Sequence, residues 1–386
     1  MPKRVTILGS TGSIGGSALD VIDSLASDFT VQGLSAHTNW ERLAEQAERH
    51  QPPGVAVTHA AGAEELRARL RRSSPRTQVH SDADGLVQLV GDPECEFVLA
   101  AVVGSAGLPA IAAAVERGVQ VGLANKEPLV AAGALLVPRA RKTGATLLPV
   151  DSEHSAVFQA MQAGRRDEVE RVYLTASGGP FRTWTREQLE SATLEDALRH
   201  PTWSMGPKIT VDSATMMNKA LEIIEARWLF DLDPDRIEVV IHPESIIHSM
   251  VEFCDGSVIA QLGSPDMRMP IQYALTHPRR RAGRARRLDF RSLRSMHFES
   301  PDPERFPALR LGYEVARRGG TAGAAFNAAN EAAVAAFRRG EIRYCEIVSM
   351  VEDVLGRHTF APRPTLEEIQ AVDAWARQEV GACCRT

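Results

Sequence analysis

Two segments of this chain carry acidic side chains at spacings that suit a metal ion. Asp151 and Glu153 are two residues apart, so in an extended chain both side chains point the same way. Asn218, Lys219 and Glu222 stand at helical spacings that place them on one face. The three carboxylates suit Mg²⁺ or Mn²⁺, whereas zinc is disfavoured because no two histidines stand at a ligand spacing nearby. The simpler alternative for the helix is a solvent-exposed Lys–Glu pair.

A second set of side chains offers hydrogen-bond donors for a phosphate group. Ser177 lies in a glycine turn after a predicted strand, and Ser213 lies shortly before Asn218 and Lys219. Neutral donors together with one ammonium charge form a suitable phosphate cradle.

The segment between these two serines combines an imidazole, an indole and a thioether in a predicted loop. Its residues of interest are His200, Trp203 and Met205. Such a loop could close over a substrate and exclude water. The alternative is a buried aromatic side chain that anchors an irregular segment.

A glycine-rich turn, Gly9 to Gly15, follows the first apolar run and opens a helical pattern. Its spacing is GxxGxxG rather than GxGxxG, but the physical logic is the same. Glycines let the backbone approach a pyrophosphate, and the helix N-terminus adds free N–H groups. Thr11 and Ser13 add hydroxyl groups. The pattern predicts nucleotide binding, with an ordinary glycine-rich turn as the alternative.

The end of the second predicted strand favours NADP over NAD. NAD-binding folds usually place an acid there for the ribose 2′-hydroxyl, and residues 34–39 contain none. His37, Thr38 and Asn39 are the candidate partners of a 2′-phosphate. The cation expected beside that group would have to be a charged His37 or Arg42.

Short apolar runs alternate with helical patterns over the first 150 residues. Uninterrupted apolar strands between helices predict a parallel sheet covered on both faces, in a Rossmann-like doubly wound domain. The expected strands are Val5–Leu8, Thr30–Ser35, Gly54–Val57, Thr77–His80, Phe97–Val103, Val119–Leu123 and Thr146–Val150. The expected helices are Gly15–Leu25, Trp40–His50 and Glu64–Arg72.

The remaining chain predicts an α/β protein with two further domains. Residues 151–276 read as a central α+β catalytic domain, 277–305 as a linker, and 306–386 as a C-terminal helical bundle domain. The expected central strands are Arg171–Ala176, Ile237–Ile241 and Ser257–Leu262, with a helix over Ala214–Leu229. The expected C-terminal helices are Leu309–Arg318, Thr321–Arg339, Tyr344–Leu355 and Leu366–Val380.

Composition limits the function classes. The 386 residues carry a net charge of −5 and a mean hydropathy of −0.17, which argues against a protein built to bind nucleic acid or anionic lipid. Six arginines within 279–287 therefore fit a solvated linker better than a nucleic-acid patch. No apolar run approaches the ~18–20 residues of a membrane span. His242 and His248 fit a core role as well as a site role.

The five cysteines are scattered without metal or CxxC spacing, which predicts a reducing compartment. The first residues run directly into a predicted strand and leave no room for a signal or transit peptide. We therefore expect a bacterial cytoplasmic protein, with a mature plastid protein as the alternative.

Six motifs, in order along essentially the whole chain, resemble the 1-deoxy-D-xylulose 5-phosphate reductoisomerase family. Each motif alone is modest, but the ordered set is specific. The motifs are Gly9–Gly15, Leu123–Glu127, Val150–His154, Ser177–Phe181, His200–Gly206 and Val211–Glu222.

The resemblance implies roles for the matched residues. Cofactor contacts fall on Thr11, Gly12, Ser13, Ile14, Asn125, Glu127 and Gly206, to which the strand-end argument adds His37 and Asn39. Substrate contacts fall on Lys126, Ser152, Glu153, Ser177, His200, Trp203, Met205, Ser213, Asn218, Lys219 and Glu222. The catalytic candidates are Lys219, Glu153 and His200, and the metal ligands are Asp151, Glu153 and Glu222. One departure is His37-Thr38, where the family often has Gly and a basic or small polar residue.

The resemblance also implies the reaction. An NADPH-dependent enzyme with Mg²⁺ or Mn²⁺, or Co²⁺ as a further option, would rearrange 1-deoxy-D-xylulose 5-phosphate by a retro-aldol/aldol route. Reduction would then give 2-C-methyl-D-erythritol 4-phosphate for isoprenoid and terpenoid biosynthesis. The proton carrier stays open between a hydroxyl at the metal, a water and Glu153. A homodimer with a flexible lid at about 177–207 is expected, without nucleic-acid or membrane partners.

Two other functions compete with this interpretation. One is an ordinary NADP-dependent dehydrogenase of the semialdehyde or homoserine type, without a metal, against which Asp151, Glu153 and Glu222 argue. The other is a catalytically silent NADP-binding scaffold or sensor. That function predicts damaged site residues, and none is visible in the sequence.

Overall fold

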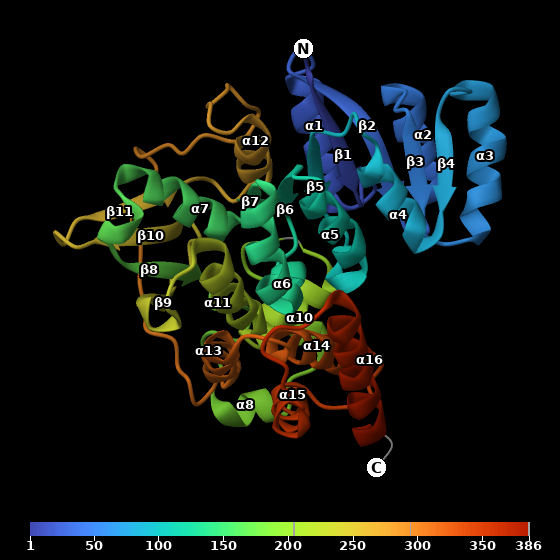
Figure 1. The fold of residues 1–386 in the computed structure, drawn as a ribbon. Coiled ribbons are helices and arrows are strands. Elements are labelled where there is room, and N and C mark those ends of the chain that lie inside the picture. Colours follow the sequence, from blue (N-terminus) through green and yellow to red (C-terminus); the bar gives the residue numbers. More distant parts are fainter. Residues whose placement is uncertain (204, 294, 385–386) are drawn as a thin grey trace. The chain divides into compact units, whose positions relative to one another are not determined.

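The computed structural model describes residues 1–203, 205–293 and 295–384, and the chain forms two compact units (Figure 1). The first unit comprises Met1–Pro128, Leu136–Ser155 and Asp266–Arg286. The second unit comprises Leu129–Leu135, Ala156–Pro265 and Arg287–Thr386. Two helices contribute residues to both units, namely α6 (Glu127–Thr143) and α7 (Ser152–Ala160).

The first unit contains one sheet of seven parallel strands in the order β4-β3-β2-β1-β5-β6-β7 (Figure 1). The strands are β1 (Lys3–Leu8), β2 (Phe29–Ala36), β3 (Gly54–Val57), β4 (Gln78–Ser81), β5 (Phe97–Ala100), β6 (Gln120–Leu123) and β7 (Leu147–Pro149). Every residue of β3 and of β5 is buried, as expected of strands covered on both faces. This arrangement confirms the Rossmann-like fold.

Helices connect these strands and cover the sheet. They are α1 (Ser13–Ser24), α2 (Trp40–His50), α3 (Ala61–Ser73), α4 (Asp82–Gly91) and α5 (Leu108–Glu116), together with α6. Helix α12 (Arg268–Thr276) comes much later in the chain and packs against α1, β6 and β7. The strand order reverses between β1 and β5, which makes their carboxyl ends the switch point of the sheet. Open α/β sheets bind ligands at such a point.

The second unit combines a four-stranded sheet with a helical bundle. The strands are β8 (Val169–Ala176), β9 (Ile237–Ile241), β10 (Ile247–Phe253) and β11 (Val258–Leu262), in the order β11-β10-β8-β9. Its helices are α8 (Arg186–Glu190), α9 (Leu194–Ala197), α10 (Pro207–Ala214), α11 (Met217–Phe230), α13 (Ala308–Arg318), α14 (Ala322–Arg338), α15 (Glu346–Arg357) and α16 (Leu366–Cys383).

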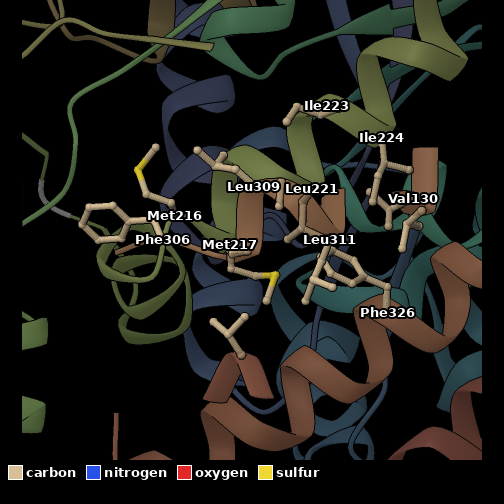
Figure 2. Close-up of a cluster of buried hydrophobic side chains, with 14 of the residues drawn as sticks. Val130, Met216, Met217, Leu221, Ile223, Ile224, Phe306, Leu309, Leu311 and Phe326 are labelled. Atoms are coloured by element: carbon tan, nitrogen blue, oxygen red, sulfur yellow. The ribbon is translucent and has the colours of Figure 1, made fainter. Parts of the chain in front are cut away.

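Helix α11 lies at the centre of this unit. It packs against β8 and β9 of the sheet and against α13 and α14 of the bundle. Figure 2 shows Met217 and Leu221 of α11 beside Leu311 and Phe326 of these two helices. A helix enclosed in this way buries polar as well as apolar positions, and ten of its fourteen residues are buried.

The structure refines several expected elements. The helix expected over Ala214–Leu229 is present as α11 but begins only at Met217, because Met216 adopts a left-handed conformation (φ 59°) between α10 and α11. Strand β10 went unpredicted. The expected lid stretch contains two short helices, α8 and α9, while Ser204 in the same stretch lies outside the described residues. Over the described part of the chain, no helix is long and apolar enough to cross a membrane.

The arginine-rich segment belongs in part to the first unit. Arg284 Nη1 lies 2.7 Å from Asp20 Oδ1, and Arg281 Nη2 lies 2.5 Å from Asp28 Oδ2. These pairs tie the segment to helix α1 and to the turn before β2. The domain boundaries predicted from the sequence stay a prediction.

Candidate active site

The glycine-rich turn connects β1 to α1 at the switch point of the first unit. Gly9 has a φ of +84°, and a Cβ there would lie 2.5 Å from the carbonyl oxygen of Ala101. A Cβ on Gly15 would lie 2.4 Å from both Gly9 O and Ser10 Cα. The fold itself therefore requires these two glycines.

Gly12 differs from both, because the fold does not require it. Its φ of −75° suits any residue, and a Cβ would meet only Gly9 O, at 3.4 Å. Gly12 is exposed and forms the N-cap of α1, and no side chain caps the helix. Close approach of a ligand to the backbone explains this glycine, so the turn fits a dinucleotide pyrophosphate.

The next cofactor candidates lie at the end of β2. Asn39 caps α2, because its Oδ1 accepts a hydrogen bond from Arg42 N at 3.1 Å. His37 and Thr38 before it are exposed. No acidic residue lies at this strand end, which agrees with the prediction that the cofactor is NADP rather than NAD.

The ends of β6 and β7 bring a lysine and an aspartate together. Lys126 follows β6 and is 6% exposed, and its Nζ lies 3.1 Å from Asp151 Oδ2. Asn125 and Glu127 flank Lys126 at the start of α6, and Glu127 is also buried. These residues form a group of predicted site residues within the first unit.

Asp151 and Glu153 do not lie in an extended segment. The expectation that an extended chain points both side chains the same way is therefore wrong. Asp151 Oδ1 accepts hydrogen bonds from Glu153 N (3.1 Å) and His154 N (3.2 Å) and thereby caps α7. Glu153 lies in the first turn of that helix, and its Oε2 accepts a hydrogen bond from Ser152 Oγ at 2.8 Å. The capping side chain is the reason that the helix begins directly after the strand.

A separate group of predicted site residues lies within the second unit, where β8 ends. Ser177 opens a turn in which Gly178 and Gly179 both have positive φ. A Cβ on Gly179 would lie 2.4 Å from the carbonyl oxygen of Ser213. The backbone of the glycine turn that follows Ser177 therefore lies close to the backbone of Ser213.

His200 is held as a neutral hydrogen-bond donor. Its Nδ1 accepts hydrogen bonds from Trp203 N (2.9 Å) and Thr202 N (3.2 Å), which leaves the proton on Nε2. Nε2 lies 3.0 Å from Ser177 Oγ and donates to it. Burial lowers the pKa of His200 from its ordinary value of 6.5.

Acidification should therefore weaken the structure around His200. A proton on Nδ1 would break both backbone hydrogen bonds, so the folded state binds this proton less readily than the unfolded state. The contribution of His200 to stability is complete above pH 6.5 and is lost as the pH falls toward the lowered pKa. Thermal unfolding between pH 7.5 and 5.5 should show a smaller loss of Tm for His200→Gln than for the wild type, and equal losses would contradict this prediction.

The predicted lid residues lie between His200 and α10. The Trp203 ring lies 6.4 Å from the ring of His248, centroid to centroid, and Trp203 and Met205 are half-buried. Gly206 is the N-cap of α10, and a Cβ there would meet no atom within 4 Å. Gly206 is therefore another glycine that the fold does not require, which suits its predicted place beside the cofactor.

The face of α11 carries a deeply buried group of polar side chains. Lys219 is 4% exposed and Glu222 is 1% exposed, so the alternative of a solvent-exposed pair is wrong. Lys219 Nζ contacts Glu222 Oε2 and donates to the carbonyl oxygen of Thr175 at the end of β8. Asn218 Nδ2 donates to Glu222 Oε1 at 2.5 Å. The three residues that helical spacing predicted to share one face therefore form one hydrogen-bonded group.

Asp151 and Glu222 offer oxygen atoms that suit a hard divalent ion. Asp151 is 8% exposed and Glu222 is 1% exposed, and both carry carboxylate oxygens. Each has an ammonium group beside it within its own unit, from Lys126 and from Lys219. Oxygen donors of this kind fit Mg²⁺ and Mn²⁺.

The structure adds two residues to those predicted. His154 is fully buried, and its Nδ1 lies 3.0 Å from Asp151 Oδ1, a contact that a spacing of three on a helix could have signalled. Asp212 of α10 lies 2.8 Å from Lys208 Nζ and accepts a hydrogen bond of 2.9 Å from Asn330 of α14. The second contact has no signal in the sequence, because its partners are 118 residues apart.

Comparison with known proteins gives matches over nearly the whole chain. The family model of 1-deoxy-D-xylulose 5-phosphate reductoisomerase matches residues 5–133. Two models of the C-terminal domains of that enzyme match residues 147–230 and 262–379.

Relatives and solved structures agree with the family models. The 1-deoxy-D-xylulose 5-phosphate reductoisomerase of Heliobacterium modesticaldum is 50% identical over 98% of this chain and 96% of its own, and that of Chloroherpeton thalassium is 48% identical over 98% and 97%. The Zymomonas mobilis enzyme, solved in complex with NADPH, is 44% identical, covers 100% of both chains and has a TM-score of 0.94. A DOX-P reductoisomerase solved with NADPH, fosmidomycin and magnesium is 38% identical, covers 99% and 98% of the chains and also has a TM-score of 0.94. With its glycine turn, its buried acids and these matches, the chain belongs to the 1-deoxy-D-xylulose 5-phosphate reductoisomerase family.

Proposed function

We propose that this protein is an NADPH- and divalent-metal-dependent oxidoreductase that converts 1-deoxy-D-xylulose 5-phosphate to 2-C-methyl-D-erythritol 4-phosphate. This step belongs to the methylerythritol phosphate route to isoprenoid precursors. The observation that carries the proposal is the buried Lys219–Glu222 pair on α11, in a chain of this family. Buried charges are rare without a partner or a ligand, and a phosphorylated ketose with a cation gives this group a function.

The cofactor residues belong mainly to the first unit. NADPH supplies the hydride for the reduction when it is bound. The turn of Thr11, Gly12, Ser13 and Ile14 binds the pyrophosphate through backbone N–H groups at the start of α1. The remaining cofactor contacts come from His37, Asn39, Asn125, Glu127 and Gly206.

The metal ligands are Asp151, Glu153 and Glu222. A bound Mg²⁺, Mn²⁺ or Co²⁺ acts as a Lewis acid toward the carbonyl and neighbouring hydroxyl oxygens of the substrate. Lys126 and Lys219 hold the orientation of Asp151 and Glu222 through the contacts described above.

The substrate residues orient the ketose phosphate. Ser177, Ser213 and Asn218 donate hydrogen bonds to the phosphate, and His200 supports this contact because its Nε2 donates to Ser177 Oγ and directs the Ser177 hydroxyl proton toward the phosphate. Lys219 binds the substrate hydroxyl groups while its Nζ is anchored on the Thr175 carbonyl. Such positioning lowers the entropic part of the barrier.

The remaining contacts close the site and handle the proton. Trp203 and Met205 cover the substrate when the lid of about 177–207 closes, and Lys126 and Ser152 complete its contacts. Glu153 is half-buried and is the protein group best suited to hold or move a proton.

The protein as a whole has the following proposed organisation. Residues 1–150 bind NADPH, residues 151–276 carry the catalytic groups, residues 277–305 link the domains and residues 306–386 form the helical domain. It acts as a homodimer in the bacterial cytoplasm, without nucleic-acid or membrane partners.

The reaction is tested by following NADPH absorbance with purified protein, 1-deoxy-D-xylulose 5-phosphate and Mg²⁺. We expect NADPH consumption that falls at least ~100-fold after treatment with EDTA and returns with excess Mg²⁺. No consumption by well-folded protein would end the proposal. Activity that survives EDTA would instead favour a metal-free NADP-dependent dehydrogenase.

A further inference from the structure

Ser213, one of the serines proposed to bind the substrate phosphate, lies between two residues that the helical bundle holds in place. Asp212 is 1% exposed and Ala214 is fully buried, whereas Ser213 between them is only half-buried. All three lie in the last turn of α10. The turn is therefore enclosed on both sides of its one partly exposed residue.

The residue before Ser213 is held by α14. Asn330 Nδ2 donates to Asp212 Oδ1 at 2.9 Å, and both side chains are buried. Lys208, one turn earlier on α10, places its Nζ 2.8 Å from the other carboxylate oxygen of Asp212. Two apolar side chains of similar size would stabilise such a helix contact about as well. The polar pair is therefore explained by the geometry that it fixes.

The residue after Ser213 is held by Tyr344, which lies just before α15. The Tyr344 hydroxyl donates to the carbonyl oxygen of Ala214 at 2.8 Å, and the tyrosine is 6% exposed. Burial raises the pKa of this hydroxyl above its ordinary value of 10.0, so it stays a proton donor. The hydrogen bond to Ala214 is therefore present throughout the neutral pH range.

The ring of Tyr344 also supports the other proposed phosphate-binding segment. It meets the ring of Phe181 edge to face, with 4.9 Å between the centroids, and Phe181 is fully buried at the end of the Ser177 turn. One side chain thus contacts both serine-bearing segments. Because a Cβ on Gly179 would lie 2.4 Å from Ser213 O, a displacement of one segment would also move the other.

We propose that Asn330 and Tyr344 are positioning residues that fix the Ser213 hydroxyl for the substrate phosphate. The inference rests on the proposed function, which places Ser213 at that phosphate. It extends substrate binding to residues of the helical bundle that act through α10. Neither residue has a signal in the sequence, because the two hydrogen bonds join positions 118 and 130 residues apart.

The kinetic test uses Tyr344→Phe, which removes only the hydroxyl group, and Asn330→Ala, which removes the amide. Each variant is expected to raise KM for 1-deoxy-D-xylulose 5-phosphate at least ~5-fold, because a displaced Ser213 loses much of a hydrogen bond to a charged phosphate. The value of kcat should stay within about 3-fold of the wild type, since the phosphate contact contributes mainly to uniform binding of the substrate. A variant that merely loosens the fold would lower the Tm without separating KM from kcat.

A binding test with inorganic phosphate needs no turnover. Phosphorus NMR on the full chain gives the dissociation constant of phosphate, with NADPH at saturation so that the cofactor positions are filled. We expect both variants to weaken phosphate binding at least ~3-fold, while the dissociation constant of NADPH stays within about 2-fold of the wild type. Wild-type protein that binds no phosphate at millimolar concentration would overturn the inference.

Matched controls remove the same groups elsewhere in the second unit. Tyr313→Phe removes a hydroxyl group that donates to Ile237 O at 2.8 Å. Asn327→Ala removes a buried amide of α14 that donates to Glu331 of the same helix. Both controls should leave KM and phosphate binding unchanged.

Thermal unfolding of every variant shows that the data refer to folded protein. If Asn330→Ala does not fold, the milder Tyr344→Phe decides. A KM of Tyr344→Phe within about 2-fold of the wild type would refute the positioning role, and so would an equal rise of KM in the controls.

Failure of this inference can be told from failure of the proposed function. Weaker phosphate binding by the two variants of a protein that leaves 1-deoxy-D-xylulose 5-phosphate unchanged would support the positioning role and refute the reaction. Turnover of the substrate with wild-type KM and wild-type phosphate binding in both variants would support the reaction and refute the positioning role.

Discussion

Glu222→Gln is expected to lower kcat by at least ~100-fold. Glu222 is 1% exposed, and its two carboxylate oxygens contact Asn218 and Lys219. The amide removes one charge from the proposed metal ligands and takes away the carboxylate that faces the ammonium of Lys219. The measurement is NADPH consumption with saturating substrate and Mg²⁺, together with Mn²⁺ binding followed by electron paramagnetic resonance.

The matched control is Glu314→Gln in the same unit. Glu314 is an exposed residue of α13 that pairs with Arg310 at 2.8 Å, so its loss should leave kcat and Mn²⁺ binding unchanged. Equal thermal stability of the two variants would separate a chemical effect from unfolding. Near-normal activity of Glu222→Gln would remove this residue from the ligand set.

Gly12→Ala and Gly15→Ala should fail in different ways. Gly12→Ala should keep the Tm of the wild type, because a Cβ there has room, but should weaken NADPH binding by at least ~30-fold, because its methyl group would fill the space proposed for the pyrophosphate. Gly15→Ala should lower stability by about 1–3 kcal/mol, since its Cβ meets backbone atoms at 2.4 Å. Fluorescence titration with NADPH and thermal unfolding measure the two effects.

Gly91→Ala serves as the control in the same unit, because a Cβ there meets no atom within 4 Å. It should change neither NADPH binding nor the Tm substantially. If Gly12→Ala bound NADPH as the wild type does, the turn would have no direct role in holding the pyrophosphate.

The sequence predicted most of the parallel sheet, because buried strands read as apolar runs and the glycine turn has a fixed spacing. It could not decide whether Lys219 and Glu222 are exposed. Burial of that face depends on β8 and β9 on one side of α11 and on α13 and α14 on the other, and these elements come from distant parts of the chain. Helical spacing reports which residues share a face but not what covers the face.

One wrong expectation has a local cause, whereas two side-chain contacts went unpredicted because they join distant parts of the chain. The extended conformation assumed for Asp151 and Glu153 ignored the capping ability of an aspartate before a helix, which a stricter reading of residues 151–154 could have found. The ring contact of His37 with His59 and the hydrogen bond between Asp212 and Asn330 join separate elements, and no local pattern signals such contacts.

The first unit is completed by a segment that is synthesised long after the rest of it. Helix α12 packs against α1, β6 and β7, and Arg268 and Arg284 pair with Asp20 of α1. During translation, domains generally fold as units from the N-terminus. During synthesis the sheet of the first unit therefore keeps its α12 surface uncovered until about 110 residues of the second unit, Ala156–Pro265, and then α12 itself have emerged from the ribosome. A fragment that ends at Ser155 would keep that surface permanently exposed and should aggregate, whereas a fragment that joins Asp266–Arg286 to it by a short linker should be soluble.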